Sequence, residues 1–191
     1  MRLSDMGIRK NRMWNRRQVR TELAELRRAD PDLNAFGARA HQYTLNSPLS
    51  QAVLASFETR HGIRLPGDYR DFLLQVGNGG AGPYYGLFPL DSYPPPDVLP
   101  SDYPDFLRTA FPHHRSWDSP HDTPGYEDDD HITGSLPIVH EGCGYIIRLV
   151  ITGPGRGNLW LDARCSDAGI HPLGISFRPW YNTWLTTGRA T

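Results

Sequence analysis

The sequence has little cysteine and no long hydrophobic run. Cys143 and Cys165 are the only cysteines among its 191 residues, which excludes the class of small disulfide-rich secreted proteins. No stretch of about 18 apolar residues occurs, so no transmembrane helix is expected. Residues 1–20 also lack the apolar segment of a signal peptide. We therefore expect a cytoplasmic protein with no membrane partner, whose two thiols stay reduced. The spacing of the two cysteines alone also allows a disulfide, which we consider the lesser alternative.

A net charge near zero conceals a strong asymmetry. The formal net charge is -1, yet residues 1–28 hold nine basic and three acidic side chains. Residues 1–28, which we call the basic arm, carry a net charge of +6, and the remaining residues carry -7. This asymmetry predicts two surfaces with different partners. For the arm we favour a solvated helix over a nucleic-acid surface, because no base-reading motif accompanies it. No direct nucleic-acid partner is expected.

Helical periodicity marks both ends of the chain. It predicts helices over residues 15–28, from Ser47-Pro48 to His61, over residues 67–76 and over residues 176–187. Serine suits the cap of a helix and proline its first position. The second helix presents an apolar stripe and ends at Gly62. That stripe consists of Leu49, Val53, Leu54 and Phe57.

Strand-like runs follow the helices. Residues 83–90 are predicted as a strand, and residues 136–142, 144–152 and 157–163 as a meander separated by glycine turns. The proline-rich and aspartate-rich insert, about 91–133, is too long for an ordinary connection and is expected to include one short helix within 101–111. The order predicts an α+β fold with helices packed around a largely antiparallel sheet. A basic helical extension over 1–46 precedes a domain over 47–187.

The glycine-rich stretch QVGNGGAGPYYGLFPL, residues 75–90, invites comparison with a phosphate-binding loop. Such a loop leads into a helix N-terminus, where free amides face the anion. Here the glycines follow a helix, whose terminal carbonyls carry partial negative charge. We interpret the stretch as a corner between helix and strand, with Gly79 or Gly80 at positive φ.

No constellation of side chains predicts catalysis. His140 precedes Cys143 by three residues, and residues three apart in a strand point to opposite faces, so we expect a buried, inert thiol. The histidines and acids of residues 113–131 lack recognised metal-ligand spacing. We expect no catalytic, cofactor or metal site. Partner contacts are instead assigned to the acidic run and to three weaker candidates. These residues are Glu127, Asp128, Asp129 and Asp130, then Tyr84, Tyr85 and Arg156.

The ordered motifs resemble the SUKH superfamily, which includes bacterial immunity proteins and a fungal regulator of cell-wall synthesis. The pattern is an acidic residue in a helix, Leu-Pro, an aromatic residue and an Asn-Gly-Gly corner, then a Gly-x-x-Trp-x-Asp strand and an aromatic closing helix. The resemblance covers roughly residues 47–187. Its fold markers are Glu58, Leu65, Pro66, Tyr69, Asn78, Gly79, Gly80, Trp160, Asp162, Trp180 and Trp184.

The resemblance implies an α+β fold and tight protein binding without catalysis. It favours an immunity protein that neutralises a cognate polymorphic toxin, and a basic nuclease fits the acidic body best. A regulatory or scaffold protein of cell-envelope synthesis is the alternative. A hydrolase that uses Cys143 and His140 is a third. The sequence names neither the toxin nor the oligomeric state.

Overall fold

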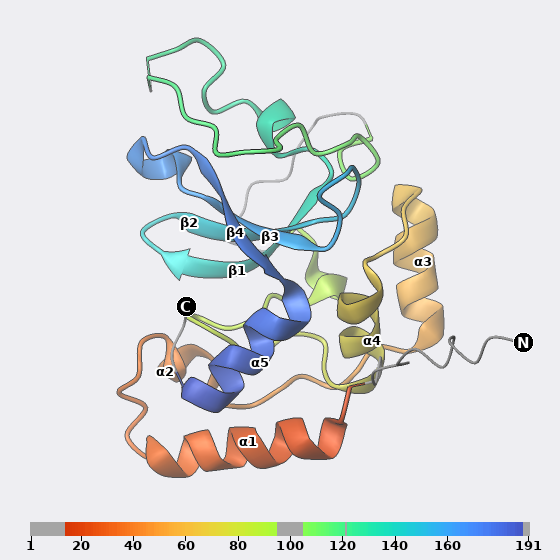
Figure 1. Cartoon of the computed structure of the whole chain (residues 1–191). Helices are drawn as coiled ribbons and strands as arrows, with labels where there is room; N and C mark the ends of the chain where they lie inside the picture. Colours follow the sequence, from red (N-terminus) through yellow and green to blue (C-terminus); the bar gives the residue numbers. More distant parts are fainter. Residues whose placement is uncertain (1–13, 95–104, 121, 189–191) are drawn as a thin grey trace, which may run out of the picture.

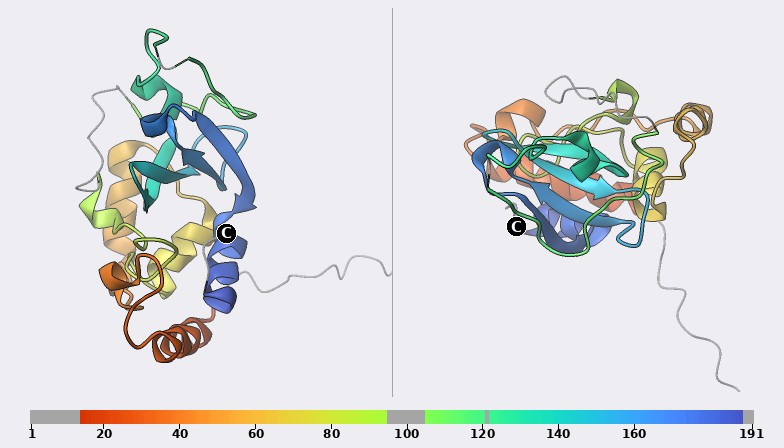
Figure 2. Two further views of the ribbon diagram at one scale, coloured as in Figure 1. Left: turned by 90° about the vertical axis from the view of Figure 1, so that its left-hand side faces the viewer. Right: turned by 90° about the horizontal axis from the view of Figure 1, so that it is seen from above.

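The protein folds as helices packed around one antiparallel sheet, which confirms the predicted α+β class (Figure 1). The computed structural model describes residues 14–94, 105–120 and 122–188. The helices are α1 (Arg16–Ala29), α2 (Ala38–His41), α3 (Gln51–His61), α4 (Gly67–Gln75) and α5 (Phe177–Thr187). In Figures 1 and 2 the helices lie at one side of the sheet, and the part of the insert after residue 105, which leads into β1, lies at the other.

The sheet has the strand order β1-β2-β3-β4, and each strand is antiparallel to its neighbour. The strands are β1 (Ser135–Gly142), β2 (Tyr145–Val150), β3 (Asn158–Asp162) and β4 (Ile170–Ser176). The first three correspond to the predicted meander, whereas β4 was not predicted. Short 3₁₀ helices lie between them and in the insert, namely η1 (Leu90–Ser92), η2 (Asp129–Ile132) and η3 (Arg164–Ser166).

Three sequence expectations for the helices need correction. Helix α3 begins at Gln51 instead of Ser47, because Ser50 caps it and the Leu49 amide donates to the Leu73 carbonyl over 2.9 Å. Val53, expected on the apolar stripe, is 46% exposed. In the insert, residues 105–108 form a turn, and residues 101–104 of the expected short helix lie outside the described residues.

An aromatic core joins the start of the chain to α4 and α5. The Trp14 ring lies 5.2 Å from Phe72, 6.1 Å from Phe177 and 5.9 Å from Tyr181, centroid to centroid, in edge contacts. Its indole N–H donates to the Asp68 carbonyl over 2.8 Å, which satisfies the buried donor. The described part of the N-terminal extension therefore packs into the same core as the rest, and a boundary at residue 46 stays a prediction.

The glycine corner keeps its predicted backbone but leads into no strand. Gly79 and Gly80 have φ of 79° and 90°, which confirms a need for positive φ. The strand predicted over residues 83–90 is wrong, because Leu87 makes only isolated bridges, to Gly80 and to Val139. Positive φ at Tyr84 and Gly86 turns the chain back before a ladder can form.

Buried hydrogen bonds explain the polar fold markers Asn78, in the glycine corner, and Glu58, in α3. The Asn78 side chain accepts from the Leu90 amide over 2.8 Å and donates to the Asp91 carboxylate over 2.6 Å. The Glu58 carboxylate accepts from the Leu65 amide over 2.9 Å and pairs with Arg70 over 3.2 Å. Because buried polar groups require partners, these residues fix the turns that follow α3 and α4.

A buried ionic group supports the sheet. The Arg164 guanidinium donates to both Asp162 oxygens, over 2.8 and 3.0 Å. Arg148 lies 3.7 Å from the same carboxylate and donates to the Ser135 hydroxyl over 2.8 Å. Burial raises the pKa of the Asp162 carboxyl, but the hydrogen bonds and charges of these arginines outweigh that effect. The pKa of Asp162 therefore lies below its ordinary value.

Candidate functional site: an aromatic and acidic face

Three aromatic side chains from two segments cluster on the surface, and we call Phe36, Tyr84 and Tyr85 the aromatic face. Phe36 is 64% exposed and Tyr85 is 44% exposed. The Phe36 centroid lies 6.4 Å from Tyr84 and 5.3 Å from Tyr85, in edge-to-face geometry. Such geometry suits the ring quadrupoles. The three rings therefore form one apolar surface in contact with water.

A single glycine allows the loop that carries Phe36 to approach Tyr84. Gly37 has φ of 76°, and a Cβ there would lie 1.9 Å from the Tyr84 carbonyl oxygen. The Asp30 carboxylate holds the start of the same loop, accepting from the Asn34 amide over 2.7 Å and the Tyr43 hydroxyl over 2.8 Å. The Asn34 hydrogen bond is the main cause that lowers the pKa of Asp30. The aromatic face thus rests on a specified loop geometry.

An apolar hollow of about 520 Å³ adjoins the aromatic face. His41, Tyr43 and Trp184 line it together with Phe36 and Tyr84. Burial lowers the pKa of His41 to about 4, and its Nδ1 accepts from the Tyr43 amide over 3.0 Å. His41 is therefore neutral at pH 7, and the hollow suits an apolar side chain of a partner.

The β1–β2 turn borders the aromatic face. A Cβ on Gly142 would lie 3.3 Å from the Phe36 ring and 3.5 Å from Tyr85. Cys143 follows, and the Cys165 thiol donates to its carbonyl oxygen over 3.2 Å. Figure 2 (left) shows from the front the side of the molecule that carries this turn.

Arg164 fixes the backbone of the acidic run. Its Nη1 donates to the carbonyl oxygens of Tyr126 and Asp128, over 3.3 and 3.0 Å. Glu127, Asp128 and Asp130 are exposed, and Asp129 is half-buried at the start of η2. Figure 1 shows this segment, in green to teal, on the other side of the sheet from α2, so the structure does not bring the predicted acidic run up to the predicted tyrosines.

Arg156 belongs to a different part of the surface. Its Nη2 donates to the carbonyl oxygens of Arg64 and Leu65, over 2.9 and 2.7 Å. Those carbonyls lie in the link between α3 and α4. The side chain therefore braces this link, and its role in partner binding stays a prediction.

The prediction of a buried thiol was wrong, because both cysteines are exposed. Cys143 occupies the turn after β1 with φ of 50°, outside the alternating part of the strand. The His140 ring lies 5.8 Å from the Tyr85 ring, centroid to centroid. Across the described residues, no group of three or more metal-ligating side chains comes together.

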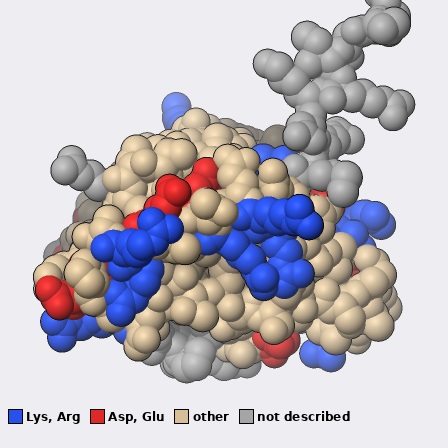
Figure 3. Space-filling view, turned by 90° about the horizontal axis from the view of Figure 1, so that it is seen from below, with Lys and Arg blue, Asp and Glu red and all other residues tan. Residues whose placement is uncertain are grey.

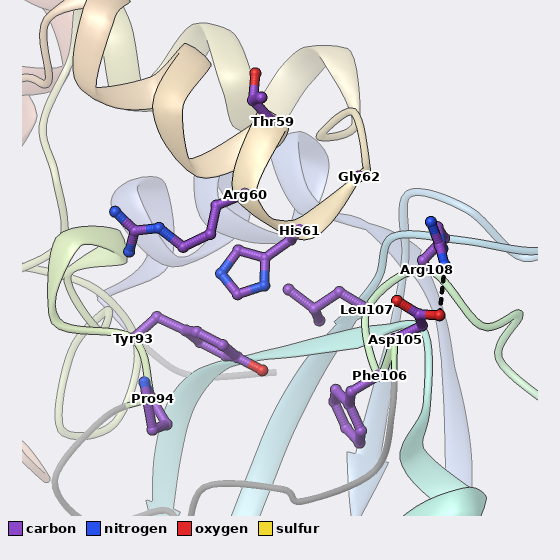
Figure 4. Close-up of a pocket in the computed structure, with 10 residues that line it drawn as sticks. All are labelled: Thr59, Arg60, His61, Gly62, Tyr93, Pro94, Asp105, Phe106, Leu107 and Arg108. Atoms are coloured by element: carbon purple, nitrogen blue, oxygen red, sulfur yellow. Dashed lines mark hydrogen bonds and ion pairs between the residues drawn. The ribbon is translucent and has the colours of Figure 1, made fainter.

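A second hollow, of about 390 Å³, lies at the C-terminal end of α3 (Figure 4). The His61 ring lies among the residues that line it (Figure 4), and its centroid is 5.5 Å from that of Tyr93 and 4.5 Å from that of Phe57. Burial and the nearby Arg60 lower the pKa of His61. The Asp105 carboxylate in the lining pairs with Arg108. The hollow can receive a small group, and sequence reasoning missed it because its walls come from separate segments.

Basic side chains gather on the outer surface of α1 (Figure 3). At 3.6 residues per turn, about 100° per residue, its five exposed arginines span an arc of about 120° that Glu22 and Glu25 lie outside. Val19 and Leu23 are buried on the inner side. The arginines are Arg16, Arg17, Arg20, Arg27 and Arg28.

In the described part of the chain, no helix combines the length and the apolar character needed to cross a bilayer.

Comparison with known proteins places this fold in a family. The family model described as SMI1 / KNR4 family (SUKH-1) matches residues 48–181. The comparisons with curated proteins and with solved structures each gave no significant match. The matched residues include Tyr84 and Tyr85 and the fold markers from Glu58 to Trp180, whereas Phe36 and Trp184 lie outside. Because the match spans more than half of the chain, the protein belongs to the SMI1/KNR4 family (SUKH-1).

Proposed function

We propose that the protein is an immunity protein that binds and neutralises a basic protein toxin, such as a nuclease, without catalysis. The observation that supports this most directly is the exposed aromatic face with the apolar hollow next to it. The family includes toxin immunity proteins and SMI1/KNR4-type regulators, and its members are generally non-catalytic. Tight binding through a surface is therefore the expected mode of action.

The aromatic face has the properties of an energetic centre of an interface. Tyrosine and other rigid rings supply large contact area at low entropic cost, and a few such residues dominate binding energy. Phe36 and Tyr85 already present their rings to water, with 64% and 44% of their surface exposed. The adjoining hollow of about 520 Å³ would receive one apolar side chain of the toxin.

Charge favours a basic partner. Residues 29–191 carry a net charge of -7, and Glu127, Asp128 and Asp130 are exposed. Complementary charge steers encounter and raises association rates, more strongly at low salt. Nucleases are basic where they bind their polyanionic substrates, so an acidic inhibitor can cover the same surface.

Co-expression tests this proposal. The protein is expressed with the toxin encoded next to its own gene, and growth is compared with and without it. We expect rescue by the wild type and loss of rescue by the double variant F36A/Y85A. Val53→Ala is the matched control, because Val53 is 46% exposed but lies on α3, away from the aromatic face. Failure to rescue growth from any neighbouring toxin would refute the proposal.

The alternative is a non-catalytic regulator or scaffold of cell-envelope synthesis. Membership of a family that includes SMI1/KNR4-type regulators favours it. A pull-down with the full chain distinguishes the two functions. Recovery of envelope-synthesis enzymes without a toxin, again dependent on Phe36 and Tyr85, would assign the same face to regulation.

A further inference from the structure

The two cysteines of the chain lie against each other at the edge of the aromatic face. They are 22 residues apart in sequence, yet the Cys165 thiol contacts the Cys143 carbonyl oxygen at 3.2 Å. A Cβ on Gly144 would come within 2.9 Å of both Cβ and Sγ of Cys165. Both thiols are free and exposed. The β1–β2 turn and η3 therefore meet at a pair of accessible sulfurs.

The contact limits how far apart the two sulfurs can lie, because the Cys143 sulfur and the contacted oxygen belong to the same residue. A disulfide forms without large strain when the two Cα atoms lie within about 7 Å. The Cys143 sulfur is joined to its own carbonyl carbon through Cα and Cβ, so rotation about χ1 carries it around the group that Cys165 already contacts. Gly142 and Gly144 flank Cys143, with φ of 120° and 85°. They give this turn the freedom to adjust.

We propose that Cys143 and Cys165 form a modification site that a peroxide converts into an intramolecular disulfide. The Cys143 thiolate attacks the peroxide, an S–O bond forms, the O–O bond breaks, and the departing oxygen takes a proton and leaves as water. The Cys165 sulfur then attacks the sulfenic acid, the S–S bond forms, and the sulfenic oxygen leaves as water with the Cys165 proton. The two thiols together lose two electrons to hydrogen peroxide.

The order of the two steps follows from the contacts of each sulfur. The Cys165 S–H is engaged with a carbonyl oxygen, which holds the proton on this sulfur. Burial, with the charges of Asp162 and Glu127, also raises the pKa of the Cys165 thiol. The thiolate is the nucleophile in both steps, so Cys143 reacts first and Cys165 resolves the sulfenic acid.

The test uses the reduced full chain and hydrogen peroxide, with intact mass and a non-reducing peptide map as readouts. We expect loss of both free thiols, a mass lower by two hydrogens, and a peptide that links Cys143 to Cys165 and separates on reduction. The rate should not depend on protein concentration, because the two thiols share one chain. Cys165→Ser should accumulate a sulfenic acid on Cys143 that dimedone traps. Cys143→Ser should react about tenfold more slowly.

Three results would overturn this inference. They are disulfide-linked dimers whose yield rises with protein concentration, sulfinic acid on Cys143 while Cys165 stays free, and equal reactivity of the two serine variants. Thermal unfolding of both variants should match the wild type, because both side chains are exposed. A disulfide here would also restrain the neighbouring aromatic face, and that consequence rests on the proposed function. Formation of the disulfide does not depend on the proposed function, so the disulfide and the binding function can fail separately.

Discussion

Replacing Gly80 with alanine should remove a large part of the stability of the fold. The residue has φ of 90°, and a Cβ would lie 2.5 Å from the Thr44 carbonyl oxygen and 3.0 Å from the Asn46 amide nitrogen. An L-residue at positive φ costs about 1–2 kcal/mol. Displacing Thr44 also breaks its 2.8 Å hydrogen bond from the Ala81 amide, at about 1–3 kcal/mol for the buried groups left unpaired. We expect a loss of about 2–5 kcal/mol in all.

Two other glycines separate conformational strain from steric overlap. Gly174 has φ of 68° but nothing within 4 Å of an added Cβ, so Gly174→Ala should cost only about 1–2 kcal/mol. Gly67 begins α4 with neither positive φ nor a close neighbour. Gly67→Ala should leave stability unchanged or raise it by up to about 1 kcal/mol, because alanine restricts the unfolded chain.

The series is measured by thermal unfolding followed by circular dichroism. For a chain of this size each kcal/mol shifts Tm by about 2–4 °C, so G80A should unfold about 4–20 °C below the wild type. We expect the highest Tm for G67A, an intermediate Tm for G174A and the lowest Tm for G80A. A G80A variant no less stable than G174A would refute the steric reasoning, because the two substitutions share the strain and differ in the overlap.

Three further predictions concern buried groups. The pKa of Asp162 is depressed in the fold, so its contribution to stability is present above its ordinary value of 3.8 and is lost as the pH falls below that value. D162N should cost about 3–5 kcal/mol at pH 7 in urea unfolding and remove that acid dependence, and an unaltered pH profile would contradict the assignment. The pKa of His41 is depressed from 6.5 to about 4, so stability should fall as the pH falls through that interval. H41F should flatten this part of the profile, whereas an unchanged slope would place the titration elsewhere. Trp14→Ala should cost about 3–5 kcal/mol, because the ring packs in the shared aromatic core. A loss below about 1 kcal/mol would instead indicate a separable N-terminal extension.

Elements with clean periodicity could be predicted from the sequence. The closing helix is the best case, because Phe177, Trp180, Tyr181, Trp184 and Leu185 are all buried, as their spacing indicates. Strand β4 lacks such a pattern, because Pro172 and Gly174 interrupt it and only Ile170 is fully buried. Proline and glycine are depleted in strands. This strand forms because β3 offers it a paired edge, a tertiary cause that no local signal reports.

The candidate site was predictable only in part, for a different reason. Tyr84 and Tyr85 stand out as adjacent aromatic residues after the glycines, but Phe36 lies in a segment without periodicity. Its exposure follows from the docking of Gly37 against the Tyr84 carbonyl, a contact between residues 47 positions apart. The proximity of Cys143 and Cys165 likewise depends on where two turns end. Sequence spacing carries no information on either contact.

The composition of the aromatic face indicates how such a protein could acquire a particular partner. Tyr84 and Tyr85 lie within the matched family residues 48–181, whereas Phe36 lies before them. The loop bearing Phe36 is held by Asp30 and by the close approach of Gly37, and the ring itself contributes little to the buried core. Because a few rings dominate an interface, changes in this loop would alter partner choice while the core stays intact. The fold common to the family would then supply a rigid platform, and the N-terminal segment would supply a large part of the specificity.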